Sequence, residues 1–378
     1  MFEKILTSYE NIINSYLSNL YKSAPVFSVE KDRPLIIFSD LHMGNGKKND
    51  DFKNNGELFT KALKDHYLAK NFTLILNGDI EELQKFEMNK IRQYWKQTFE
   101  IFDGFSKENR LIKIIGNHDD KLLTGLTDCR YDEKQAARFT IPDSDVPIFI
   151  FHGHQASVYY KYLNRLNTIL LRYIVNPIGI RNFSKKFKHH KKMRIENRSY
   201  NFSRNKKLIS IIGHTHRPLF ESLSRADSLH FSIENLLRKY RKAGNRKRMI
   251  IAARIKDLKR KYDDCTESKP DYEPASLMYS SGIPVPCLFN TGCAIGKRGI
   301  TGIEITTETI SLVHWFDSRI SNRFLFDSEL QPVPLNENSP IHRVVLREDS
   351  LDYISDSINL LSNSEANNNN FSMMLNKI

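Results

Sequence analysis

Cysteine is scarce in this chain of 378 residues, and its four cysteines lie far apart along the sequence. They are Cys129, Cys265, Cys287 and Cys293, and no two of them form a C-x-x-C pair. In a chain of this length, such spacing argues against a disulfide framework and against a zinc knuckle. We therefore expect reduced thiols and a cytoplasmic location.

Long apolar runs are absent as well. The longest candidate, residues 169–180, is interrupted by Arg172, Asn176 and Pro177, and no run reaches the ~18 apolar residues of a membrane-spanning helix. The first 21 residues are apolar only at helical intervals. This pattern predicts an amphipathic helix within residues 1–30 and does not resemble a signal peptide.

Positive charge is abundant but unevenly distributed. The formal net charge is +13 at pH 7. Residues 181–207 carry a net charge of +10, with Glu196 as the single acid, and residues 222–285 carry +6. The rest of the chain has a net charge of −3, as a cation-binding region would require. Surface cations can also contact nucleic acid or, at roughly 1 kcal/mol per side chain, acidic lipid.

Short apolar runs bounded by turn residues predict strands, and helical periodicity lies between several of them. The predicted strands are 35–38, 73–76, 111–115, 148–151, 208–212, 287–289, 302–305 and 309–315, and the predicted helices are 56–69, 84–102 and 133–138. Alternation of strands and helices predicts an α/β fold with sheets packed between helices.

Metal-binding residue types follow five of these apolar runs. The motifs are Asp40-Leu41-His42, Gly78-Asp79, Gly116-Asn117-His118-Asp119, His152-Gly153-His154 and Gly213-His214-Thr215-His216. Each motif alone is a weak signal, but five in this order are hard to reach by chance. They offer carboxylate, imidazole and amide ligands for two adjacent divalent ions, which can clamp both oxygens of a phosphoryl transfer.

The order and spacing of these motifs resemble the calcineurin-like metallophosphoesterase superfamily. The resemblance implies an α/β fold of the four-layer αββα type, here with a helical, basic cap insertion. The metallophosphoesterase core is expected at 31–155, 208–221 and 286–345, with a basic helical cap at 156–207, a second basic insertion at 222–285 and a partly disordered tail at 346–378.

The same resemblance implies a role for each motif residue. One metal ion would take Asp40, His42, Asp79 and His216, and the other would take Asp79, Asn117, His152 and His214. Asp79 would therefore bridge the two ions, for which we expect Mn²⁺, with Fe or Zn²⁺ as alternatives. A metal-bridging hydroxide would attack phosphorus, His118 would act as general acid, and Glu82 would orient His118.

Three further features of the sequence have several interpretations. His154 can be a ligand, a substrate contact or a hydrogen-bonding neighbour of the ligands, and we favour a role other than ligation. The turn Asn290-Thr291-Gly292 either contributes to the site or simply ends a strand. His189 and His190 lie in the basic segment and are expected at the surface.

The expected activity is hydrolysis of a phosphate ester or diphosphate. The insertion at 156–207 resembles the plan of UDP-2,3-diacylglucosamine diphosphatases, which act at the membrane face, but those enzymes place Arg where this chain has His118. A nuclease and a non-catalytic scaffold of the same fold remain alternatives. The expected partners are a phosphorylated substrate, an anionic membrane face and, less favoured, nucleic acid.

Overall fold

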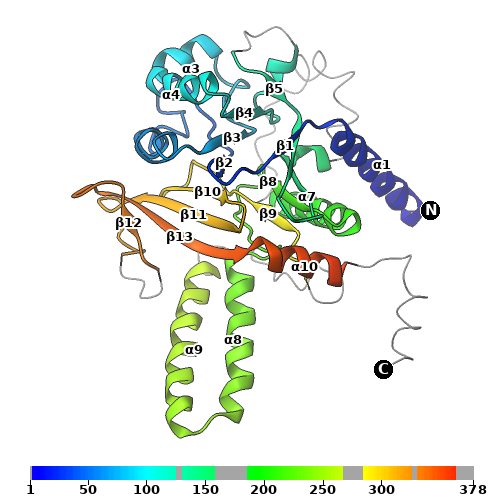
Figure 1. Cartoon of the computed structure of the whole chain (residues 1–378), viewed down its shortest axis with the longest axis vertical. Helices are drawn as coiled ribbons and strands as arrows, with labels where there is room; N and C mark the ends of the chain where they lie inside the picture. Colours follow the sequence, from blue (N-terminus) through cyan, green and yellow to red (C-terminus); the bar gives the residue numbers. More distant parts are fainter. Residues whose placement is uncertain (1, 125–129, 158–184, 267–283, 326–329, 363–378) are drawn as a thin grey trace.

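Two β-sheets with helices on their outer faces make up the body of the molecule in the computed structural model (Figure 1). The structure describes residues 2–124, 130–157, 185–266, 284–325 and 330–362. Its fold is mixed α/β and confirms the expected αββα sandwich.

The smaller sheet has five strands in the order β1-β6-β7-β8-β9. These strands are β1 (Val26–Ser28), β6 (Ala136–Thr140), β7 (Ile148–Phe151), β8 (Ile209–Ile212) and β9 (Leu288–Asn290). Neighbouring strands β7, β8 and β9 are parallel. Their carboxyl ends therefore meet at one edge of the sheet.

The larger sheet has eight strands in the order β12-β13-β11-β10-β2-β3-β4-β5. These strands are β2 (Leu35–Phe38), β3 (Thr73–Asn77), β4 (Leu111–Ile114), β5 (Glu133–Lys134), β10 (Ile300–Ile305), β11 (Thr309–Asp317), β12 (Val333–Pro334) and β13 (Ile341–Ser350). Strands β2 to β5 are parallel, and the other four pair antiparallel.

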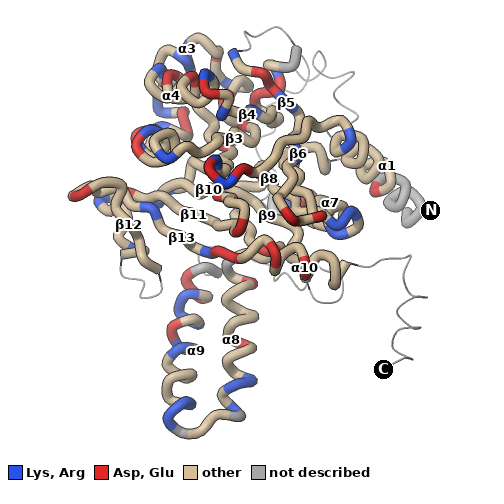
Figure 2. The backbone as a smooth tube through the Cα atoms, viewed as in Figure 1, with Lys and Arg blue, Asp and Glu red and all other residues tan. Residues whose placement is uncertain are grey.

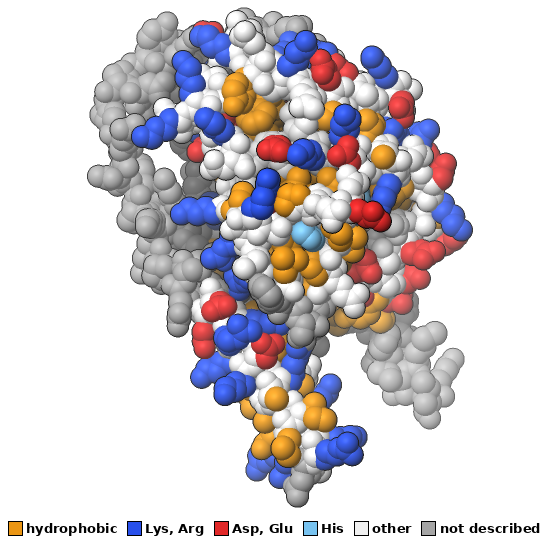
Figure 3. All heavy atoms as spheres, turned by 90° about the vertical axis from the view of Figure 1, so that its left-hand side faces the viewer, with side chains coloured by type: hydrophobic (Ala, Val, Ile, Leu, Met, Phe, Trp, Pro, Cys, Tyr) orange, Lys and Arg blue, Asp and Glu red, His pale blue; other side chains and the backbone are white. Residues whose placement is uncertain are grey.

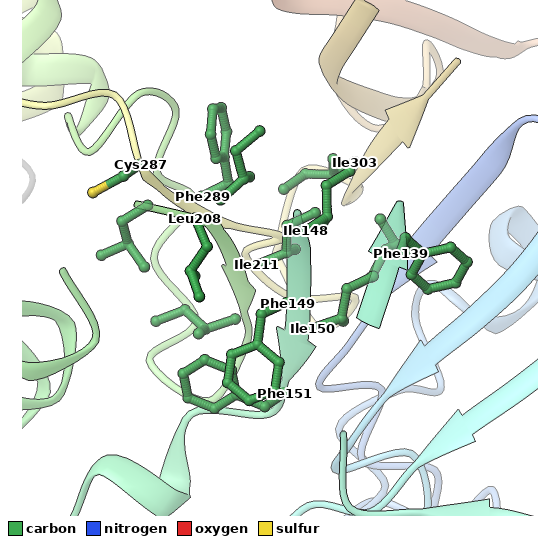
Figure 4. Close-up of a cluster of buried hydrophobic side chains, with 14 of the residues drawn as sticks. Phe139, Ile148, Phe149, Ile150, Phe151, Leu208, Ile211, Cys287, Phe289 and Ile303 are labelled. Atoms are coloured by element: carbon green, nitrogen blue, oxygen red, sulfur yellow. The ribbon is translucent and has the colours of Figure 1, made fainter. Parts of the chain in front are cut away.

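Side chains alternate between two cores along the central strands. In β2, Leu35 and Ile37 belong to the core shared with the smaller sheet, whereas Ile36 and Phe38 belong to the core beneath the outer helices. Both faces of β2 are thus buried, which explains why its sequence is a continuous apolar run. In β7, Phe149 and Phe151 are both fully buried (Figure 4).

Helices cover the outer faces. Helices α1 (Phe2–Ser23) and α7 (Lys185–Lys206) pack on the smaller sheet, and α2 (Gly56–Ala62), η1 (Leu63–Leu68), α3 (Met88–Tyr94) and α4 (Lys96–Lys107) cover the larger one. Tyr21 of α1 packs edge-on against Phe149, with ring centroids 5.3 Å apart. The predicted N-terminal amphipathic helix is therefore a helix of the sandwich. None of the described helices is both long and apolar enough to span a bilayer.

The eight predicted strands are all present, each within two residues of its expected bounds. The predicted helix at 133–138 is wrong, because this segment forms β5 and β6. Ala136 and Ala137 favour helix by intrinsic propensity, but both are buried in the smaller sheet, between β1 and β7. Tertiary pairing therefore outweighs local propensity at this position.

The segment 346–378, expected as a partly disordered tail, contains folded elements in its described part. Strand β13 pairs with β11 up to Ser350, and α10 (Leu351–Leu361) follows it directly. Leu351, Ile354 and Ile358 of α10 are buried in the core of the smaller sheet. Residues 346–361 are therefore part of the folded body, and residues beyond 362 lie outside the described part of the chain.

The expected cap at 156–207 is only partly described, because its apolar first half, residues 158–184, lies outside the described residues. The basic second half forms α7. Ile195, Tyr200 and Phe202 of this helix are buried against the smaller sheet. Helix α7 is therefore an outer layer of the sandwich. The cap as a whole extends outside the described residues and stays a prediction.

Lys113 and Glu81 form an ion pair inside the larger sheet, with 2.6 Å between Nζ and Oε1 and both side chains almost fully buried. We expect Lys113→Met to lower the free energy of unfolding by about 3–5 kcal/mol, because a buried carboxylate would lose its partner. Urea unfolding measures this. Lys61→Met removes the exposed pair with Glu57 and should cost under ~1 kcal/mol. Equal losses of unfolding free energy in the two variants would contradict the conclusion that Lys113 and Glu81 form a buried pair.

Candidate metal centre

The predicted site residues come together where the carboxyl ends of both parallel strand sets meet. Asp40 and His42 follow β2, Asp79 follows β3, and Asn117 and His118 follow β4. His152 follows β7, and His214 and His216 follow β8. Three groups of these side chains have potential ligand atoms within 4.8 Å of one another: Asp40, His42 and His216; His42, Asp79 and His118; Asp79, His152 and His214.

The backbone at this seam adopts an uncommon conformation. Five site residues have positive φ angles of 50–64°, namely Asp40, His42, Asp79, His214 and His216. Positive φ is rare for non-glycine residues and costs free energy, and clusters of it are typical of functional sites. Here the positive φ angles turn the backbone sharply after each strand. Residues two apart, such as Asp40 and His42, therefore direct their side chains into the same site.

The motif glycines provide the space for this convergence. A Cβ atom at Gly116 would overlap Oδ1 and the backbone nitrogen of Asp79. A Cβ at Gly78 would overlap the His152 ring, and one at Gly213 would overlap the side chains of Ser39 and Asp40. The glycines in the motifs are therefore required by close packing of the loops around the acidic groups.

The first ligand group centres on Asp40. Its Oδ2 accepts hydrogen bonds from the Ser39 hydroxyl and from the backbone N–H of His214, at 2.9 Å for the latter. Its Oδ1 lies 3.1 Å from His216 Nε2. The Nε2 atoms of His42 and His216 are only 3.2 Å apart. Such convergence of two imidazole nitrogens and one carboxylate oxygen fits a shared divalent ion.

Asp79 lies between the two halves of the site. Its Oδ2 is 3.1 Å from His152 Nε2 and 3.9 Å from His42 Nε2, while its Oδ1 accepts a hydrogen bond from the His118 backbone N–H at 2.8 Å. One oxygen thus faces a histidine of each predicted metal set. This is the position that a bridging carboxylate requires.

Hydrogen bonds fix which nitrogen each imidazole presents to the site. His152 Nδ1 donates to the Asn77 carbonyl at 2.7 Å, which leaves Nε2 toward Asp79. Glu82 Oε2 accepts from His42 Nδ1 at 3.2 Å, and its Oε1 is 2.8 Å from His118 Nδ1. Neighbouring groups of this kind commonly set the tautomer and orientation of metal-binding histidines.

The charges in the site stabilise one another. Burial alone would raise the pKa of Asp79, but His152, His118 and His42 hold it well below its usual value. Burial would lower the pKa of His152, but Asp79 and Asp40 raise it to about 9. The carboxylates therefore stay ionised although they are buried, and the site demands positive charge.

Several ligand atoms in this region have no hydrogen-bond partner among the described residues. Two of them are Asn117 Oδ1 and His214 Nδ1. Buried polar atoms without a partner are rare in folded proteins. His214 is partly buried, and burial lowers its pKa to about 3, so that its imidazole is neutral. Neutral imidazoles and ionised carboxylates are the forms that bind metal, so His214, Asp40 and Asp79 fit a divalent metal centre.

A family model described as calcineurin-like phosphoesterase, Metallophos, matches residues 33–251. The chain belongs to this family. No curated protein matches the chain. The family uses divalent metals, and the two ligand groups that share Asp79 in this calcineurin-like phosphoesterase agree with that use.

Two residues to which the sequence analysis assigned no role tie the loops of this calcineurin-like phosphoesterase together. Asp119 is fully buried and accepts hydrogen bonds from the backbone N–H groups of Ile80 and Gly116. Glu196 of α7 is also fully buried and accepts a hydrogen bond from Thr215 Oγ1 at 2.7 Å. Glu196 is the single acid in the basic segment 181–207. A lone acid among many cations is the sequence feature that could have indicated its structural role.

Lys192 also holds the loop after β8 in place. Its Nζ donates to the carbonyl of Thr215, between His214 and His216, at 2.8 Å. The side chain is half-buried, and burial lowers its pKa. This cation therefore stabilises the metal-binding loop and is not a free surface charge.

The other features left open by the sequence fall in different places. Asn290 Nδ2 donates to the Gly213 carbonyl at 3.0 Å and to Thr215 Oγ1 at 2.9 Å, so the turn at 290–292 supports the loop after β8. His154 is buried, with its ring 5.4 Å from that of His152, and is outside the three ligand groups. The side chains of His189 and His190 lie outside the described part.

We expect Gly116→Ala to lower the affinity for Mn²⁺ about 10–100-fold, because the added methyl group would displace Asp79. Gly104→Ala is the matched control. A Cβ at Gly104, within α4, would meet Leu68 Cδ2 at 3.5 Å, an ordinary contact, and alanine favours helix by about 0.5–1 kcal/mol. Calorimetric titration and thermal unfolding measure both variants. Unchanged Mn²⁺ affinity in Gly116→Ala would contradict the assignment.

Proposed function

We propose that this protein is a dinuclear-metal-dependent phosphoesterase that hydrolyses a phosphate ester or diphosphate, with His118 as general acid. The observation that supports it most directly is the position of Asp79 Oδ2, between His152 Nε2 and His42 Nε2 at 3.1 and 3.9 Å. A single carboxylate facing both histidine sets is the arrangement expected for two adjacent ions. Family membership supports hydrolase chemistry in general.

In this proposal the ligands are the seven residues named from the sequence. They are Asp40, His42, Asp79, Asn117, His152, His214 and His216. Two divalent ions, when bound, supply positive charge to the phosphoryl oxygens and an activated water. Mn²⁺ is the favoured ion, with Fe or Zn²⁺ as alternatives, since mixed imidazole and oxygen ligands suit all three.

His118 suits the role of proton donor by its exposure and by its support. Its side chain is 26% exposed, whereas that of His152 is fully buried. Burial alone would lower its pKa, but the hydrogen bond to Glu82 and the charge of Asp79 raise it. The ring therefore holds a proton, with Nδ1 fixed by Glu82 and Nε2 left for the leaving group.

Two narrower proposals have less support. The hypothesis of a lipid-precursor diphosphatase depended on a cap at 156–207. The first half of this segment is outside the described residues, and the second half, α7, packs on the smaller sheet. A nuclease would use the basic segments, but Lys192 of the first segment is engaged with the Thr215 carbonyl. A non-catalytic scaffold has no feature in its favour, because every motif residue is present.

We expect the purified protein to hydrolyse para-nitrophenyl phosphate or its diester only with divalent metal. Chelation should abolish the activity, and Mn²⁺ should restore it, because ionised Asp79 and Asp40 need cations to bind a phosphate anion nearby. Initial rates and metal analysis test this. Protein that holds fewer than two metals per chain and stays inactive in Mn²⁺ would support the scaffold instead.

Binding and chemistry should separate in two variants. His118→Ala should keep both metals and lose about 10²–10⁴-fold in turnover, the usual contribution of a general acid. A substrate with a better leaving group should recover part of this loss.

Asp79→Ala should lose metal itself, because its carboxylate faces both histidine sets. His230→Ala, at an exposed position on α8, is the control and should change neither property. Loss of metal from His118→Ala would show that His118 is a ligand and that the roles are assigned wrongly.

A further inference from the structure

A long helical hairpin extends from the body of the molecule. Helices α8 (Arg225–Lys242) and α9 (Asn245–Thr266) run side by side, and their free end points away from both sheets (Figure 1). At 1.5 Å per residue, the 18 residues of α8 span about 27 Å. The turn is held by Arg248, whose Nε donates to the Tyr240 carbonyl at 3.3 Å.

The positive charge of the hairpin is concentrated in the half that lies far from the body (Figure 2). Residues 237–254 contain eight Lys or Arg and no acid. The other half, residues 225–236 and 255–266, contains five of each and has no net charge. A helix that merely needed solubility would not require this separation, so the pattern indicates a role for the tip.

Ion pairs show the same division. Near the body, Asp257 pairs with Lys261 at 3.1 Å, and Asp264 pairs with Arg323 at 3.6 Å. In the distal half, the exposed cations are Arg238, Lys239, Arg241, Arg246 and Lys247. None of these five has an ion pair with any described residue. Their charge is therefore available to an external partner.

Large apolar side chains are exposed among these cations. Met249 is 77% exposed, Ile250 66% and Leu237 53%. Figure 3 shows hydrophobic side chains gathered with Lys and Arg at the end of the hairpin. An isolated exposed apolar residue needs no explanation, but several together on a projecting tip indicate an interaction site.

We propose that the distal half of the hairpin, residues 237–254, attaches the protein to the surface of a bilayer that contains anionic lipid. The cations would lie at the headgroups, each strengthening binding about five-fold. Met249, Ile250 and Leu237 would enter the boundary between headgroups and acyl chains, as the apolar residues of interfacial helices do. The proposal depends on the hairpin alone and is independent of the reaction at the metal centre.

The aliphatic side chains favour a bilayer over nucleic acid. Phosphates of a nucleic acid would also attract the cations, but its sequence-independent binding uses cations and stacked aromatic rings. Tyr240 is the one aromatic residue of the distal half, and its ring lies under the Arg248 guanidinium, 5.6 Å away. Two adjacent aliphatic residues, Met249 and Ile250, have no use in that mode of binding.

Vesicle sedimentation of the full chain tests the proposal with two matched variants. Arg246→Glu/Lys247→Glu changes the tip, and Lys256→Glu/Lys259→Glu makes the same change of charge at exposed positions in the other half of the hairpin, on the side of the body. On vesicles of equal phosphatidylcholine and phosphatidylglycerol, the tip variant should bind about 30-fold or more weakly than the unchanged protein. The control should change under ~3-fold, since its cations lie away from the surface.

A fluorescent reporter tests insertion separately. The two native tryptophans, Trp95 and Trp315, are buried and give a constant background. Ile250→Trp should show a blue-shifted emission when anionic vesicles are added and no shift with phosphatidylcholine alone. Hydrolysis of a small soluble ester should stay unchanged in every hairpin variant, which also shows that the body is folded.

Three results would overturn the proposal. Equal losses in the tip and control variants would show that only net charge matters. Unshifted emission of Ile250→Trp with anionic vesicles would exclude insertion. Tip-dependent binding to a DNA or RNA oligonucleotide, without vesicle binding and without any effect of Met249→Ser/Ile250→Ser, would assign the tip to nucleic acid.

Discussion

Burial of the Asp79 carboxylate is the constraint on which the rest of the site depends. A buried charge is tolerated only when opposite charge and hydrogen bonds surround it, and here His152, His42 and the His118 backbone N–H supply them. Bringing these groups so close requires sharp turns after the strands and glycines at the points of contact. The positive φ angle of Asp79 and the absence of a side chain at Gly116 are therefore consequences of one electrostatic requirement.

Much of the site could be predicted from the sequence, because each motif residue follows an apolar strand and strand ends meet at one edge. What could not be predicted are contacts between segments with no sequence relation. Glu82 was expected to orient His118, but its second oxygen also holds His42, 40 residues earlier. Glu196 of α7 accepts a hydrogen bond from Thr215 in the loop after β8. The sequence does not show that these two segments are neighbours, so the role of this isolated acid could not be predicted.

The fold, too, was predicted only in part from the sequence. Buried parallel strands such as β2 were predicted because both of their faces are apolar, and β6 and β13 were missed because their sequences carry charges or favour helix. The different roles of the two basic segments could also not be predicted from the sequence. Both are basic in the sequence, yet one belongs to a helix that packs on the smaller sheet, whereas the other forms a hairpin with exposed cations at its tip. Net charge alone does not distinguish a packed face from an interaction surface.

The central claim is that one carboxylate serves two metal ions, and electron paramagnetic resonance of the Mn²⁺-loaded protein tests it most directly. Ions that share Asp79 must lie within a few ångströms of each other, as two-metal sites do at about 3.5–4 Å. At full loading we expect the spectrum of a magnetically coupled pair. A spectrum of isolated, uncoupled Mn²⁺ at full loading would contradict the account.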